Sequence, residues 1–263
     1  MEATVTGLAT RLRLVRPALL GALPFAVLVV VWEVLARSHV LNRVLVSSPS
    51  LIVAALAKQL SNGTIQRDLA ASAVEFAIGF GLSVVVGVLV GVVMGWYRPL
   101  SHALAPPLWL SYNAPFFALS PLLVVLLGLG TPTVVAITFL ITVVPIVVNT
   151  AAGVRNVDHI LVRAARSFGA TDLQIFRKVA LPASVPYLMA GLRLGVGRAL
   201  VGVIAGEFFG GKTGLGYSIS YFAGTLQTDN MMVSVVIAAM IGVFLTQGAN
   251  RLERWLDAWR GWG

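Results

Sequence analysis

The sequence predicts an all-α, polytopic membrane protein with about six transmembrane helices. Of its 263 residues, 58% are hydrophobic and only 11% are charged, and the mean hydropathy is +0.90. Soluble domains are about 45–50% apolar and about 25% charged, so these values exclude an ordinary soluble enzyme, a disordered regulator and a nucleic-acid-binding protein. The length accommodates roughly five to seven spans of about 20 residues with their connections.

Six apolar runs supply the predicted spans. They are Ala18–Ala36, Leu69–Tyr97, Leu104–Leu129, Val134–Ala152, Val185–Phe209 and Met231–Ala249. Backbone in lipid must satisfy its own hydrogen bonds, which favours helices. The first run follows three arginines, as in a signal peptide, but it is long for a signal core and no cleavage pattern follows, so we expect it to be retained. The third run contains four prolines, which leaves open whether it is one helix or two.

The placement of lysine and arginine predicts the orientation. With the N-terminus in the cytoplasm, 12 of the 19 basic residues fall on inner segments, five on outer segments and two within a span. Basic residues concentrate on the cytoplasmic side of membrane proteins, so both termini are expected to be cytoplasmic. The net charge of +9 then reflects topology and contact with membrane lipids, and it implies no nucleic-acid partner.

No linker divides the chain into soluble domains. We expect a cytoplasmic segment over residues 1–17, a transmembrane domain over 18–249 and a cytoplasmic tail over 250–263. The tail carries Leu252, Trp255, Leu256 and Trp259 at helical spacing. This pattern is typical of an amphipathic helix that lies on the inner membrane surface. On the outer side, Ser50 is expected to cap a short helix over Leu51–Leu60.

Residues 153–184 form the longest inner loop, and local signals predict two short helices in it. Gly169 is a typical C′ residue for the first helix. Thr171 and Gln174 have the spacing of a capping box that starts the second helix, and Pro182 is expected to end it. Such an ordered loop suggests docking to another protein, although a solvated connector remains the alternative.

This loop also resembles a known signature. Permease subunits of ATP-binding-cassette importers carry here Glu-Ala-Ala, three residues, Gly, nine residues, Ile, one residue and Leu-Pro. The matching residues are Ala164, Ala165, Gly169, Val179, Leu181 and Pro182, with Arg163 in place of the glutamate. The resemblance implies that the loop couples the permease to its ATPase. It assigns that role to Arg163, Ala164, Ala165, Arg166, Phe168, Gly169, Ala170, Leu181 and Pro182.

The resemblance covers roughly residues 46–250 and is closest to the nitrate, sulfonate, taurine and bicarbonate branch. It is carried by Ser48-Pro49-Ser50, Ala114-Pro115, Pro121-Leu122, Gly128-Leu129-Gly130, Gly191-Leu192-Arg193 and Gly214-Leu215-Gly216-Tyr217. It implies a type I importer permease fold in the cell inner membrane. It also implies a subunit with no ATPase site or cofactor of its own, because a partner ATPase binds ATP and magnesium.

The partners implied by the resemblance are a second permease copy, expected as a homodimer, two ATP-binding-cassette subunits on the cytoplasmic side, and a periplasmic or surface solute-binding protein. The expected solute is a small organic or inorganic anion such as a sulfonate, taurine or nitrate. A pyrimidine vitamin precursor or an aromatic acid is an alternative. A transporter driven by an ion gradient is the alternative from a different class.

One segment matches the spacing of a nucleotide-binding loop by chance. Residues 206–213 read Gly-Glu-Phe-Phe-Gly-Gly-Lys-Thr, which fits G-x4-G-K-T. A true phosphate loop follows a strand and lies in the cytosol. Here an apolar helix precedes it and the predicted topology places it outside. We therefore expect no ATP binding at this segment.

Charged and helix-breaking residues within the spans are the candidates for the solute pathway. An arginine at a helix centre costs about 2.5–3.5 kcal/mol on insertion scales, so Arg193 and Arg198 need a reason. Either they face the solute or they form structural ion pairs. The full candidate set is Asn113, Pro115, Glu75, Arg193, Arg198 and Glu207. The glycine sets 87, 91, 95 and 202, 206, 210 are expected to permit close helix contact. The three histidines are scattered and predict no metal site.

Overall fold

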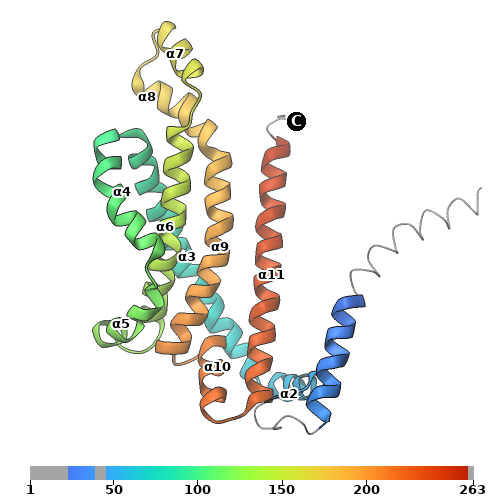
Figure 1. Cartoon of the computed structure of the whole chain (residues 1–263). Coiled ribbons are helices and arrows are strands. Elements are labelled where there is room, and N and C mark those ends of the chain that lie inside the picture. Colours follow the sequence, from blue (N-terminus) through green and yellow to red (C-terminus); the bar gives the residue numbers. More distant parts are fainter. Residues whose placement is uncertain (1–22, 39–45, 260–263) are drawn as a thin grey trace, which may run out of the picture. The chain divides into compact units, whose positions relative to one another are not determined.

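A computed structural model describes residues 23–38 and 46–259, except for the side chains of Asn113 and of residues 256–259. All regular elements within these ranges are helices or helical turns. Residues 23–37 form the first described helix. The elements that follow are α2 (Pro49–Ser61), α3 (Thr64–Trp96), α4 (Arg98–Asn113), the 3₁₀ turn η1 (Phe116–Leu119), α5 (Ser120–Leu127), α6 (Thr131–Arg155), α7 (His159–Ser167), α8 (Asp172–Ile175), the π turn η2 (Phe176–Ala180), α9 (Leu181–Gly210), α10 (Leu215–Gly224) and α11 (Thr228–Trp259) (Figure 1).

Within the described residues, four helical stretches are long and apolar enough to cross a membrane. They are Thr64–Trp96, Thr131–Arg155, Asp172–Gly210 and Thr228–Trp255, and they coincide with four of the predicted spans. The third predicted span consists of two helices, because the segment Arg98–Tyr112 meets Phe116–Leu127 at a bend of 84°. The predicted first span, Ala18–Ala36, begins outside the described residues.

One compact unit comprises the described residues before Gly63 together with Phe222–Val233. The Ser48 hydroxyl group caps α2 by accepting a hydrogen bond from the Leu51 N–H group. The expectation that Ser50 is the cap was wrong, because Pro49 provides the first helical turn and starts the helix earlier. Ser50 instead donates its hydroxyl group to Glu33, at 2.7 Å.

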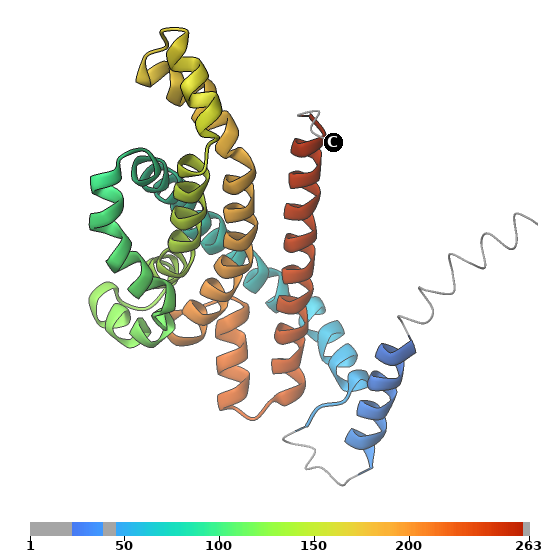
Figure 2. The same cartoon turned by 45° about the horizontal axis from the view of Figure 1, so that its top comes forward.

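The second unit comprises Gly63–Tyr221 and the chain from Ser234 onward. Its centre is α6, which packs against both α3 and α9 (Figure 2). The backbones approach closely at glycines: a Cβ atom at Gly91 would lie 2.6 Å from the Thr150 Cβ atom, and one at Gly202 would lie 2.8 Å from the Thr138 Cα atom. The predicted role of the two glycine sets in close helix contact is therefore confirmed.

The helix that follows the inner loop does not end at Pro182. The helical run from α8 through η2 into α9 is continuous, so the expectation of a helix end at this proline was wrong. The π turn Phe176–Ala180 immediately precedes α9 and places Pro182 in the first turn of α9. Proline has no N–H group to donate, and in the first turn of a helix this group needs no helical partner, so proline is tolerated at that position.

The C-terminal tail is helical, as its spacing predicted, but it is the last part of α11 and not a separate helix. Glu253 in this part forms an ion pair with Arg193 of α9, at 2.6 Å. No break occurs near residue 250, because no proline or glycine interrupts Ala249–Trp259.

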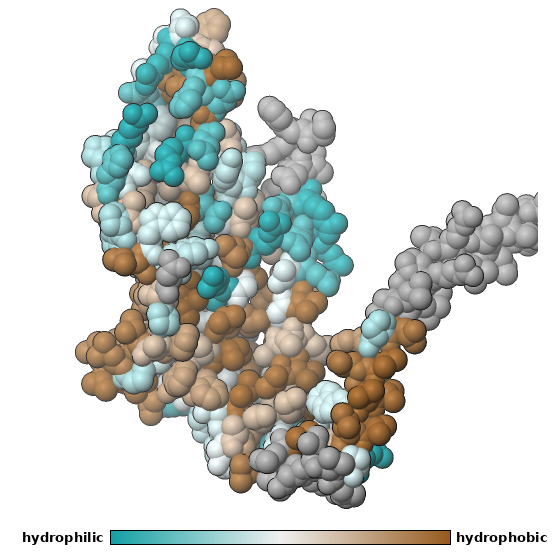
Figure 3. All heavy atoms as spheres, in the orientation of Figure 1, coloured by the Kyte–Doolittle hydropathy of each residue, from teal (hydrophilic) through white to brown (hydrophobic). Residues whose placement is uncertain are grey.

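The surface of the second unit has an apolar and a hydrophilic region. In Figure 3, apolar residues gather over α5, whereas hydrophilic residues prevail over α7 and α8. Val125 on α5 is 82% exposed despite its apolar side chain. Exposure of this kind is costly in water and favourable in lipid, which supports a membrane environment for α5.

The close contact between α3 and α6 predicts a difference between two glycines of α3. Gly91→Ala should lower the stability of the protein by about 1–3 kcal/mol, because the new methyl group meets Thr150 and the Val147 carbonyl group. Gly81→Ala is the matched control, since nothing lies within 4 Å of a Cβ atom there. It should be neutral or gain about 0.5–1 kcal/mol from helix propensity. Thermal unfolding of the purified proteins measures both, and equal melting temperatures would refute the packing described above.

Candidate functional site

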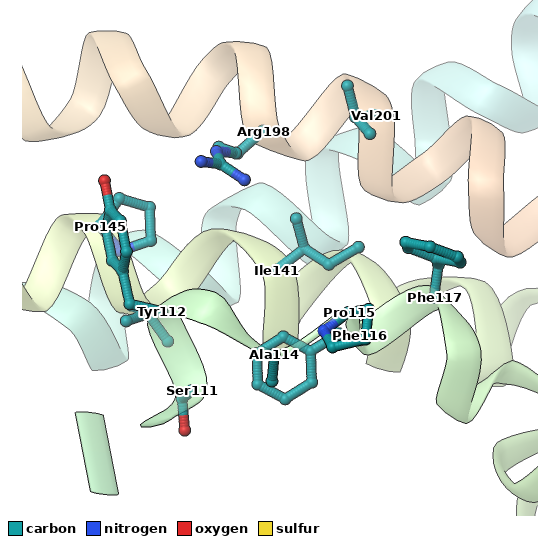
Figure 4. A pocket seen from close by; sticks show the side chains of 11 residues that line it. Ser111, Tyr112, Ala114, Pro115, Phe116, Phe117, Ile141, Pro145, Arg198 and Val201 are labelled. Atoms are coloured by element: carbon teal, nitrogen blue, oxygen red, sulfur yellow. The ribbon is translucent and has the colours of Figure 1, made fainter. Parts of the chain in front are cut away.

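A cavity of about 260 Å³ lies in the second unit where α4 bends toward η1, beside α6 and α9 (Figure 4). Most of its wall is aromatic or aliphatic. The lining residues are Ser111, Tyr112, Ala114, Pro115, Phe116, Phe117, Ile141, Val144, Pro145, Arg198 and Val201. A concave, mostly apolar site with a few polar groups is the usual form of a small-molecule site.

The bend that opens this cavity follows from Pro115. A residue that precedes proline avoids the helical conformation, and Ala114 is accordingly extended, with φ −69° and ψ 133°. The Phe116 N–H group then donates to the Ala114 carbonyl group at 2.9 Å, which closes a tight turn before η1. Broken helices inside membrane proteins are tolerated where they line a cavity, as this one does.

Arg198 is the one charged side chain in the cavity wall. It projects from α9 toward the helices that carry Tyr112 and Ile141 (Figure 4). Its guanidinium carbon lies 5.9 Å from the centre of the Tyr112 ring. None of the ion pairs formed within the described residues includes Arg198. A cation–π contact contributes about 0.5–2 kcal/mol and leaves the positive charge available to an anion.

The remaining pathway candidates lie elsewhere. Arg193 pairs with Glu253 and is not part of the cavity wall, which matches the structural ion pair that the sequence left open. Glu75 and Glu207 are buried and also lie outside the wall. The side chain of Asn113 is outside the described part of the chain. The structure therefore brings Pro115 and Arg198 together at the cavity and separates them from Arg193, Glu75 and Glu207.

Glu207 belongs to a buried polar network that sequence reasoning missed. Its carboxyl group accepts hydrogen bonds from the Ser72 hydroxyl group at 2.5 Å and from the Gly216 N–H group at 2.7 Å. Asp68 accepts from the Gly214 N–H group at 3.3 Å and from the Ser218 hydroxyl group. The sequence contained a pattern that indicates this network, because Asp68, Ser72 and Glu75 follow each other at spacings of four and three residues and so share one face of α3.

The segment 206–213, which has the spacing of a phosphate loop, lies at the end of this network. Its first five residues are the last part of helix α9, which ends at Gly210, so no strand precedes it. The C-terminal end of a helix presents free carbonyl groups and partial negative charge, the opposite of what a phosphate requires. This geometry agrees with the expectation that the segment binds no ATP.

The inner loop contains the two predicted helices. Gly169 has a φ of 75° directly after α7, and Thr171 and Gln174 form the complete capping box of α8. Phe168, which lies between α7 and α8, is 91% exposed. Arg166 pairs with Asp172 at 3.1 Å, which joins the two helices. The loop thus presents an exposed aromatic side chain on an ordered turn.

Two contacts join this loop to the long helices. Ile175 at the end of α8 is 1% exposed, so α8 is anchored. The next residue, Phe176, packs its ring edge-on against Trp96 at the end of α3, with 5.0 Å between ring centres. Because α8, η2 and α9 are one helical run, the loop is joined directly to α9.

Comparison with known proteins agrees with this arrangement. Residues 83–261 match the family described as "Binding-protein-dependent transport system inner membrane component". A Brucella abortus protein described as a probable ABC transporter permease is 32% identical, over 99% of each chain. The formylaminopyrimidine transport permease of Halalkalibacterium halodurans is 31% identical, over 92% of this chain and 96% of its own. The taurine transport permease of Escherichia coli is 29% identical, over 90% of this chain and 88% of its own.

A solved structure also shares the fold. A chain of the MetNI methionine ABC transporter, in an inward-facing conformation, matches with a TM-score of 0.56 and 24% identity. The match covers 73% of this chain and 93% of the other. The all-α importer permease fold expected from the sequence is therefore confirmed.

These findings place the chain in the inner membrane as a multi-pass transport subunit. It is not an enzyme, and separate ATPase subunits bind the ATP. The alternative of a transporter driven by an ion gradient is thereby set aside. The chain belongs to the family of binding-protein-dependent transport system inner membrane components, the permeases of ABC importers.

Proposed function

We propose that this permease carries a small organic or inorganic anion, such as taurine or another sulfonate, through the cavity at the bend of α4. The observation that supports this function is the position of Arg198, a charged side chain in a mostly apolar wall. Among the described residues, no carboxylate forms an ion pair with it. A charge in such surroundings is costly, and an anionic solute would neutralise it. The similarity to a taurine permease is consistent with this class of solute.

An aromatic acid or a pyrimidine vitamin precursor is the second candidate. Tyr112, Phe116 and Phe117 give the wall three aromatic rings, against which a planar heterocycle could stack. The similarity to a formylaminopyrimidine permease favours this solute to the same degree. The role of Arg198 separates a neutral pyrimidine, which gains little from the positive charge, from the anionic solutes, among which an aromatic acid also belongs.

The segment from α7 through α8 is proposed to dock on the ATPase. Phe168 offers an exposed aromatic anchor, and Arg163 and Arg166 place positive charge beside it. Such an anchor with a polar rim is typical of protein interfaces. Arg163 stands where the family signature has glutamate, so the matching ATPase surface should offer an acidic group at this point. Continuity of α8 with α9 would carry the motion of the ATPase to Arg198.

The complete transporter is proposed to contain two copies of this chain, two ATPase subunits and a solute-binding protein on the outer side. Each chain offers one docking segment, and a closed pair of ATPase subunits needs two, which a homodimer supplies. Both termini are proposed to be cytoplasmic, with residues 1–17 before the transmembrane domain (18–249) and residues 250–263 after it. The distribution of basic residues supports this orientation.

Arg198→Gln should impair uptake by about tenfold to a hundredfold if the solute is an anion. Contacts of charged groups contribute about 1.5–3 kcal/mol, and each 1.4 kcal/mol is a factor of ten. The solute is first identified by mass spectrometry of the ligand that co-purifies with the binding protein. Its uptake into proteoliposomes then gives KM and the maximal rate.

Arg193→Gln is the matched control for this experiment, because Arg193 lies on the same helix and pairs with Glu253. It should leave the KM of uptake unchanged, although it can reduce the yield of folded protein. Normal uptake of an anionic solute by correctly inserted Arg198→Gln protein would refute the proposed role of the cavity.

Gly169→Val should reduce association with the ATPase several-fold. A β-branched residue is strained at the φ of 75°, so the turn that presents Phe168 must change its geometry. Gly63→Val is the control, because Gly63 has a φ of 76° and, like Gly169, nothing within 4 Å of a Cβ atom. The yield of ATPase that co-purifies with the tagged chain measures the effect. The docking proposal fails if both variants retain the ATPase equally well.

A further inference from the structure

Three carboxyl groups are buried in the second unit without a basic partner. Asp68, Glu75 and Glu207 are 1%, 3% and 0% exposed, respectively. The ion pairs within the described residues include none of them. Three unpaired negative charges at this depth would cost many kcal/mol, so hydrogen-bond donors or protons must compensate for them.

Donors account for two of the three. Asp68 accepts from the Gly214 N–H group and the Ser218 hydroxyl group, and Glu207 accepts from the Ser72 hydroxyl group at Oε1 and the Gly216 N–H group at Oε2. Both carboxyl groups therefore act as acceptors. The Ser72 hydroxyl group in turn accepts from the Leu215 N–H group at 3.0 Å, so the backbone donors of the α9–α10 connection converge on this point.

Glu75 differs from the other two. Its hydrogen-bonding partners are the Thr131 side chain and Glu207, and its Oε2 atom is buried without any partner. Two ionised carboxylates cannot form a hydrogen bond with each other, because neither has a donor. One of the two carboxyl groups must therefore carry a proton and donate it to the other.

The surrounding elements offer no positive charge in place of a proton. On α3 itself Arg67 is exposed, and in the α9–α10 connection Lys212 is exposed. On α9, Arg193 pairs with Glu253, and Arg198 lies in the cavity wall against Tyr112. The one ionisable side chain of α6 is Arg155, at its far end, and α10 contributes the neutral phenols Tyr217 and Tyr221. A metal ion is also not accommodated, because the described residues contain no group of three ligands that could hold one.

We propose that Glu75 and Glu207 form a buried proton-binding site, in which one proton held between the two carboxyl groups lets one donate a hydrogen bond to the other and so joins α3 to α9. Loss of this proton leaves two adjacent carboxylates that repel each other in a medium of low polarity. The effect reaches the α9–α10 connection directly, because Gly214 and Gly216 pack so closely against Glu207 that a Cβ atom at either position would collide with its side chain. The site thus makes the contact between α3, α9 and α10 sensitive to pH.

Infrared spectroscopy of the purified transporter tests the protonation state, and neither solute nor ATP is required. At neutral pH the wild-type protein should show the C=O stretching band of a buried carboxylic acid, and Glu75→Gln should remove this band. Asp229→Asn is the matched control, because Asp229 lies in α11 outside this network, and it should leave the band unchanged. Identical spectra of wild type and Glu75→Gln would overturn the proposal.

Thermal unfolding against pH provides the second measurement. Glutamine at position 75 keeps a donor toward Glu207 and cannot lose a proton at any accessible pH. The wild-type melting temperature should therefore fall by several degrees relative to Glu75→Gln as the pH is raised. Parallel curves, or failure of Glu75→Gln to fold, would contradict the proposal, because the glutamine replaces what the protonated acid does. Either result leaves the assignment of the solute cavity unaffected.

Discussion

The arrangement of the second unit depends on the close approach of α6 to both α3 and α9. In lipid, little hydrophobic force draws apolar helices together, so contact relies on van der Waals packing that small residues permit. Gly91 and Gly202 provide this contact, with no room for a Cβ atom on either side of α6. Once the three helices are fixed, α4 and η1 can close a cavity over α6 and α9, and the carboxyl groups of α3 and α9 meet.

The second organising feature is the continuous helix from α8 to α9. From Leu181 to Arg198 this helix rises about 26 Å, at 1.5 Å per residue, so it links the inner loop to the cavity. Pro186 lies in its interior, and the π turn Phe176–Ala180 interrupts its regular hydrogen bonding. Turns of this kind are rare and frequently occur at functional sites, and here the turn lies directly against Trp96 of α3. A movement of the loop would therefore act on α3 and α9 together.

Patterns that depend on neighbouring residues were read correctly from the sequence. The apolar runs predicted four long helices, while the four prolines of the third run left open the break that the structure shows. Gly169 predicted the end of the first loop helix, and Thr171 and Gln174 predicted the start of the second. Features that depend on distant residues were not predicted. The helix end assigned to Pro182 was wrong, because a π turn just before it makes the proline acceptable. The network of Asp68, Ser72 and Ser218 was missed because its partners are about 140 residues apart, although their helical spacing on α3 was visible. The pairing of Arg193 with Glu253 could not be chosen over solute contact without the position of α11.

The central claim is that the cavity beside Arg198 lies on the path of the solute. The chain contains no cysteine, so a single Val201→Cys substitution in the cavity wall can be labelled without further changes. Val125→Cys on α5, 82% exposed and outside the wall, is the lipid-facing control. If the cavity is on the path, a charged, water-soluble thiol reagent modifies position 201 in the assembled transporter at a rate that changes on addition of ATP, while position 125 stays unreactive. Equal failure of both cysteines to react, with and without ATP, would contradict the account.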